Sequence, residues 1–182
     1  MENKDRLLEY TIPQLLRRRV NETGDKVALR EKDFGYWNNY TWNDYFEQVR
    51  KIALGLEQVG IKKGDKLALI GDNIPEMLFM AIGAQSTGAV SAGIYQTTLP
   101  DEIAQLINYM DVTAVFCDDQ EQVDKLVEIR DQIPQVHKVI YEDPRGMRDY
   151  QSDDWYLFIG DLYEMGAAAH AENPEKYDAL ID

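Results

Sequence analysis

The sequence predicts an α/β fold, built as a doubly wound parallel sheet with helices on both faces. Two observations predict it. Short apolar segments alternate with helical patterns of about ten residues across residues 60–141, and such alternation implies parallel strands joined by right-handed crossovers. The apolar segments carry little polar alternation, as expected of strands buried on both faces.

The first elements are predicted from local signals. Thr11 and Gln14 have the spacing of a capping box, and Pro13 suits a first helical turn. The stretch "DKVALREKDFGYWNNYTW" predicts two short strands around a loop at residues 33–35. Thr41 then caps a long helix, with Asp44 at its third position.

Apolar periodicity and turn residues delimit the remaining elements. In the long helix, residues spaced for one face are Tyr45, Val49, Ile52, Leu56 and Val59, and Gly60 supplies the stop. Strands are predicted at 66–70, 88–95, 113–117 and 137–141, and helices at 74–87, 100–110 and 121–130. We divide the chain into an N-terminal α/β subdomain, residues 1–141, and an acidic, turn-rich extension, residues 142–182. Within the extension, "WYLFIGDLYEMGAAAHA" predicts one strand followed by a short helix.

Composition excludes some classes of function. The chain of 182 residues is 45% apolar and 29% charged, which is typical of a globular protein. Its formal net charge of −14, of which −8 falls in residues 142–182, repels nucleic acid and anionic lipid. The net charge does not exclude peripheral contact with a membrane. Cys117 is the single cysteine, so no internal disulfide is possible and a reducing compartment is expected. With no signal peptide and no apolar run of about 20 residues, we expect a cytoplasmic protein.

A strand–glycine–helix sequence at residues 71–73 raises the question of a phosphate site. Asn73, Pro75 and Glu76 form a helix-capping pattern, and Asp72 adds negative charge where the helix dipole is positive. This charge opposes phosphate. The turn has one glycine, and the sequence contains no Gly-Lys pair. We interpret the turn as a strand-to-helix joint.

The remaining candidates are weighed in the same way. Cys117 suits a core position, and the isolated His137 and His170 make a poor metal site. Asp118 and Asp119 are interpreted as helix caps rather than cation ligands. The stretch "YQTTLPDE", residues 95–102, offers hydroxyls at the carboxyl end of a strand, where open α/β sheets bind ligands; the alternative is a helix cap at Thr98 or Leu99. We therefore assign no catalytic, cofactor-binding or metal-binding residue.

The order of several short motifs resembles the N-terminal portion of the adenylate-forming acyl-CoA synthetases, over residues 11–182. The subfamily that it resembles most is the long-chain fatty acid–CoA ligases, including the bubblegum-type branch. The motifs are Thr41-Trp42, Ala53-Leu54-Gly55-Leu56, Gly60-Ile61 with Gly64-Asp65, Asn73, Gly88-Ala89-Val90 and Tyr95-Gln96-Thr97.

The resemblance implies an acid–thiol ligase that uses ATP and Mg²⁺ to form an acyl-AMP and then transfers the acyl group to CoA. The family's phosphate loop, ribose-binding acid and catalytic lysine have no counterpart in this sequence, so the matching positions are structural. We expect this chain alone to be inactive and to bind none of the three cofactors. Two alternatives stay open: a ligase for another carboxylic acid, and a free-standing acidic domain that binds a protein partner. The resemblance also implies an incomplete N-terminal subdomain, which leaves one sheet edge and one apolar face without a cover. We therefore expect a homodimer; the alternative is a monomer whose acidic tail, residues 142–182, covers that face.

Overall fold

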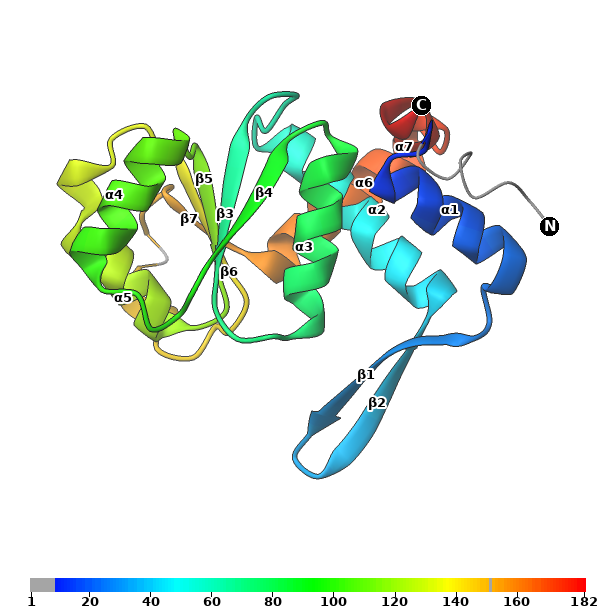
Figure 1. Ribbon diagram of the computed structural model, residues 1–182, viewed down its shortest axis with the longest axis horizontal. Coiled ribbons are helices and arrows are strands. Elements are labelled where there is room, and N and C mark those ends of the chain that lie inside the picture. Colours follow the sequence, from blue (N-terminus) through cyan, green and yellow to red (C-terminus); the bar gives the residue numbers. More distant parts are fainter. Residues whose placement is uncertain (1–8, 151) are drawn as a thin grey trace.

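A computed structural model describes residues 9–150 and 152–182 (Figure 1). A five-stranded parallel sheet with helices on both faces forms the body, and a two-stranded antiparallel hairpin projects from it. The elements are α1 (Ile12–Thr23), β1 (Val27–Asp33), β2 (Tyr36–Thr41), α2 (Trp42–Gln58), β3 (Lys66–Ile70), α3 (Pro75–Ser86), β4 (Val90–Ile94), α4 (Pro100–Met110), β5 (Ala114–Cys117), α5 (Gln120–Glu128), η2 (Arg130–Gln132), β6 (Lys138–Tyr141), η3 (Met147–Asp149), β7 (Tyr156–Phe158), α6 (Ile159–Glu172) and α7 (Lys176–Ile181).

The sheet confirms the predicted fold class. Its strand order is β4-β3-β5-β6-β7, and every neighbouring pair is parallel. Strand β3 lies between β4 and β5, so Leu67 is in register with Ser91 on one side and with Ala114 on the other. The chain therefore winds first toward β4 and then back across β3 toward β7, which is the doubly wound arrangement.

Alternate residues of the strands face two separate cores. Leu67 and Leu69 of β3 belong to a core with residues from α1, α2, α3, α6 and α7. Ala68 and Ile70 belong to a second core, with residues from α4 and α5. All four are at most 7% exposed. Because successive side chains of a strand point to opposite faces, two apolar cores require helices on both sides of the sheet.

The helix starts with clear local signals are confirmed. Thr11 accepts from the backbone of Gln14, whose side chain reaches back to the Thr11 amide, and Thr41 and Asp44 form the same reciprocal pair. Helix α2 ends before Gly60, which has a φ of 89°. This left-handed conformation, which favours glycine, closes the helix as predicted.

Residues beyond 141 contribute to the same sheet and core. Strand β7 pairs with β6, and α6 packs closely on α2: a Cβ placed on Gly166 would lie 1.8 Å from the Lys51 carbonyl oxygen. Tyr177 of α7 is 1% exposed and shares a 3.2 Å hydrogen bond with Ser86. Helix α6 is 14 residues long, longer than the short helix expected, and α7 was not predicted. The division at residue 141 stays a prediction.

Strand β4 forms one edge of the sheet. Its Val90 is 56% exposed, and the nearby Tyr95 and Leu99 are also exposed. No helix among the described residues is long and apolar enough to cross a membrane.

Candidate functional site

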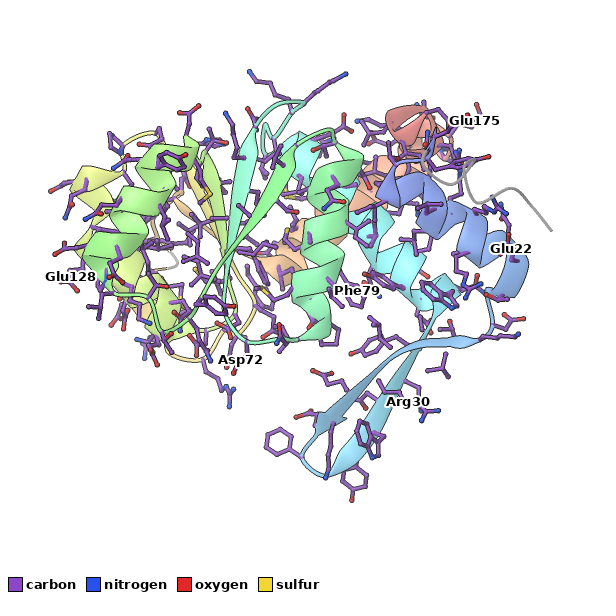
Figure 2. All side chains as sticks on the ribbon, viewed as in Figure 1. Glu22, Arg30, Asp72, Phe79, Glu128 and Glu175 are labelled. Carbon is purple, nitrogen blue, oxygen red and sulfur yellow. The ribbon has the colours of Figure 1, made fainter. Side chains whose placement is uncertain are left out.

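The carboxyl ends of β3 and β5 meet at the point where the winding direction of the sheet reverses. Open α/β sheets bind their ligands at such a point. Gly71 and Asp72 follow β3, and Asp118 and Asp119 follow β5. Figure 2 shows Asp72 at this edge of the sheet, on the side toward which the hairpin projects.

The Asp118 side chain closes this point. It is 8% exposed, and its Oδ2 accepts a 2.7 Å hydrogen bond from the Asp72 amide. A Cβ placed on Gly71 would lie 2.4 Å from Asp118 Cγ, so the glycine leaves room for this carboxyl group. Asp118 Oδ1 is buried and has no hydrogen-bond partner among the described residues, and burial raises the pKa of the carboxyl. The glycine of the turn thus serves a contact within the chain.

The start of α3 differs from the sequence-based prediction. Ile74, and not Asn73, is the N-cap, and no side chain in the described part of the chain caps this end. The prediction of Asn73 as the cap was wrong because Pro75 takes the first helical position, where its fixed φ and missing N–H are best tolerated. The residue before a proline is extended, and Ile74 has a φ of −99° and a ψ of 160°.

A carboxylate cluster, defined here as Glu31, Glu76 and Glu142, lies beside this helix start. Burial, followed by the charges of Glu76, Asp143, Asp118 and Glu31, raises the pKa of Glu142 to about 7. Burial also raises the pKa of Glu76, opposed by its own backbone N–H and reinforced by Glu31. None of the three forms an ion pair within the described residues. The field here opposes an anion such as phosphate.

Two tyrosines lie close to the carboxylate cluster. Tyr40 donates a 3.2 Å hydrogen bond to Glu31 Oε2, and burial raises the pKa of Tyr40 to about 12. Burial, reinforced by Glu76 and Glu142, raises the pKa of Tyr163 as well. Both phenols therefore stay protonated at neutral pH. Within the described part of the chain, no group of three or more His, Cys, Asp or Glu side chains is arranged to hold a metal ion.

Hydrogen bonds fix the segment that follows β4. Gln96 Nε2 donates to Asp72 Oδ1 at 2.7 Å, and Lys125 Nζ donates to the Gln96 carbonyl at 2.5 Å and to Gln122 Oε1 at 3.0 Å. Sequence reasoning missed Lys125. Its spacing of four residues from Glu121, with which it forms an ion pair at 3.1 Å, explains its place on α5 but not its contact with Gln96, after β4.

The hydroxyl-rich segment 95–102 turns into α4. Leu99 is the N-cap, without a side-chain hydrogen bond, and Thr98 N donates to the Tyr95 carbonyl at 3.0 Å. Tyr95 is 85% exposed, and Thr97 is exposed as well. Contact of these residues with a ligand stays a prediction.

A cleft of about 780 Å³ opens between the hairpin and the start of α3. Its apolar lining comes from both elements, and charged hairpin residues form part of its wall. Sequence reasoning missed it because the docking angle of a hairpin has no local signal. The lining residues are Leu29, Arg30, Glu31, Lys32, Trp37, Asp72, Asn73, Ile74, Pro75, Met77 and Leu78.

The other candidate residues lie apart. Cys117 is fully buried, as predicted for a core residue, and burial raises the pKa of its thiol. Asp119 caps α5, accepting from the Gln122 amide at 3.1 Å, as predicted. The prediction of Asp118 as a cap was wrong, because its carboxylate accepts from the Asp72 amide instead. His137 is exposed before β6, whereas His170 lies on α6, where burial lowers its pKa.

Comparison with known proteins gives consistent matches. A family profile described as "AMP-binding enzyme" matches residues 16–176. The human long-chain-fatty-acid–CoA ligase ACSBG1 is 29% identical over 96% of this chain and 23% of its own length. The Xenopus laevis ligase ACSBG2 is 29% identical over 73% of this chain and 18% of its own length. This chain thus spans less than a quarter of these relatives.

Solved structures share the fold at lower identity. The anthranilate CoA ligase AuaEII, in complex with anthranoyl-AMP, superposes with a TM-score of 0.72 and 18% identity over 85% of this chain and 27% of that protein. A putative long-chain-fatty-acid CoA ligase from Rhodopseudomonas palustris gives a TM-score of 0.70 and 21% identity over 84% and 36%.

Proposed function

The chain belongs to the AMP-binding enzyme family, and on that premise we propose that it forms the N-terminal α/β region of a long-chain fatty acid–CoA ligase. The observation that carries the proposal is the similarity to ligases of that name along nearly the whole chain. Such a ligase joins a fatty acid to ATP, forming an acyl-AMP and releasing pyrophosphate. The CoA thiol then attacks the acyl carbon, and AMP leaves.

In this proposal the described residues contribute structure and not catalysis. The point between β3 and β5 is closed by Asp118, and the carboxylate cluster beside it opposes the phosphates of ATP. ATP, Mg²⁺ and CoA would then be held by parts of the ligase outside this chain. A homodimer and a cytoplasmic location complete the proposal, the latter supported by the free, buried Cys117.

The activity is tested on the polypeptide encoded by the uninterrupted reading frame that contains this sequence. It is supplied with ATP, Mg²⁺ and CoA, and acyl-CoA formation is compared for palmitate, benzoate and acetate. We expect palmitate to have the highest kcat/KM. A higher kcat/KM for benzoate or acetate would contradict the long-chain assignment without contradicting membership of the family.

The 182-residue chain alone is tested separately. We expect no pyrophosphate release from ATP and palmitate above a heat-killed control, because stabilisation of phosphoryl charge is usually the dominant catalytic contribution. Release above that control would show that the chain carries catalytic groups.

A further inference from the structure

The β1–β2 hairpin ends in three exposed aromatic side chains. Phe34 is 89% exposed, Tyr36 79% and Trp37 62%; we call these three residues the aromatic tip. Figure 1 shows the hairpin projecting away from the helices and the sheet, with its turn farthest from the body. Three large apolar rings within four residues are an unusual surface for a water-facing turn.

The base of the hairpin is fixed, so the tip is held at a distance from the body. Ala28, Leu29 and Tyr40 pack on the core, and the Tyr40 ring lies 5.7 Å from that of Phe79, edge to face. Beyond this base, residues 30–33 span about 13 Å at the usual rise of a strand. The hairpin therefore presents Phe34 and Tyr36 beyond a short, anchored stem, while Trp37 also lines the cleft between the hairpin and α3.

The turn itself is made with an unfavourable residue. Asp33 pairs with Tyr36, so Phe34 and Gly35 form a two-residue turn, with φ angles of 43° and 87°. Turns of this kind favour Asn-Gly or Asp-Gly, because a bulky residue is strained at positive φ. Strain that a stable fold retains at an exposed position points to a role for the residue.

The charge around the tip differs from that of the rest of the chain. Residues 25–41 contain three acids, Asp25, Glu31 and Asp33, and three bases, Lys26, Arg30 and Lys32. Their net charge is zero in a chain with a net charge of −14. A neutral, aromatic stem can approach a neutral lipid surface, whereas the acidic body is repelled by an anionic one.

We propose that the aromatic tip inserts into the surface of a zwitterionic lipid bilayer. Phe34 enters the boundary of the acyl chains, while Tyr36 and Trp37 lie at the headgroups, where amphipathic rings are favoured. One hairpin gives weak and reversible attachment, since interfacial binding scales with the buried apolar area. The contact needs no ligase activity, so it can be tested independently of the proposed function.

The experiment is flotation of the 182-residue chain with phosphatidylcholine vesicles. The test variant is Phe34→Asn, which removes the ring and supplies the residue that this turn prefers, so that lost binding is not lost folding. Its matched control is Tyr109→Ser, because Tyr109 on α4 is also 89% exposed. We expect Phe34→Asn to lower the partition coefficient about tenfold or more and Tyr109→Ser to leave it unchanged.

Two further measurements sharpen the result. Phosphatidylcholine vesicles should shift the tryptophan emission to shorter wavelength in the unaltered chain and not in Trp37→Phe. Vesicles that contain about 30% phosphatidylserine should bind less of the unaltered chain at low salt. No flotation of the unaltered chain, or equal losses in Phe34→Asn and Tyr109→Ser, would overturn the proposal. The proposal would also be overturned if the unaltered chain did not bind vesicles and Phe34→Asn changed the molecular mass measured without lipid. That result would assign the aromatic tip to contacts between copies of the chain.

Discussion

Replacing Glu142 by glutamine is expected to stabilise the chain at alkaline pH. Glu142 follows β6 and is half-buried. The groups that act on it are acidic: Glu76 from α3, Asp118 after β5, Glu31 from the hairpin and the adjacent Asp143. The charge of Glu142 also acts on Tyr163 and on Arg145. Arg145 is already hydrogen-bonded to Asp143.

The magnitude follows from the pKa. The rise of the Glu142 pKa from 4.5 to about 7 means that ionising Glu142 lowers the free energy of unfolding by at most about 3.4 kcal/mol. Solvent screening at a half-exposed carboxyl lowers this to about 1–2 kcal/mol. Since the folded state raises the pKa, it binds the proton more tightly than the unfolded state. The stabilisation is therefore full below pH 4.5 and is lost as the pH rises through about 7.

Urea unfolding of the unaltered chain and of Glu142→Gln measures this difference. At about pH 8.5 the variant should gain about 1–2 kcal/mol in the free energy of unfolding, and at about pH 5 less than half of that gain. The matched control is Glu128→Gln, because Glu128 is exposed on α5, away from the carboxylate cluster (Figure 2). Equal effects of the two variants, or a gain independent of pH, would refute the electrostatic explanation.

Three further predictions concern packing, capping and assembly. Gly166→Ala should cost about 3 kcal/mol of stability in urea unfolding, because the added Cβ would meet the Lys51 carbonyl. The control, Ala167→Gly at the exposed neighbouring position, should cost about 1 kcal/mol. Asp119→Ala should cost about 1 kcal/mol as a lost N-cap, and Asn73→Ala less than about 0.5 kcal/mol; the reverse order would restore Asn73 as a cap. Light scattering at about 0.15 M salt should give a dimer, and Val90→Lys on the β4 edge a monomer; a monomeric unaltered chain would contradict this.

Local signals predicted much of the fold. Thr11, Thr41 and Asp119 cap their helices as expected, because a cap depends on residues within one turn. The prediction of Asn73 as a cap was wrong for an equally local reason, because Pro75 prefers the first helical position. The doubly wound parallel sheet was predicted from the alternation of strands and helices, which constrains the connections between parallel strands, whereas the order of its strands was not predicted.

What the sequence did not predict depends on contacts between distant segments. The contact of α6 with α2 requires Gly166 to face the Lys51 carbonyl, and nothing near either residue encodes their distance. The carboxylate cluster combines Glu31, Glu76 and Glu142, which are more than forty positions apart in sequence. The hairpin loop was predicted at residues 33–35, but the projection of the hairpin depends on how Tyr40 packs on Phe79.

The carboxyl edge of the sheet has a consequence for where a nucleotide could bind. An incoming phosphate would have to displace Asp118 from the Asp72 amide, which would leave that amide without its partner. It would also approach Glu76 and Glu142, and its negative charge would repel both carboxyl groups when they are ionised. Both effects raise the free energy of a bound phosphate. We therefore expect that, in a ligase built on this region, the positive groups that hold ATP come from another segment and lie away from this edge.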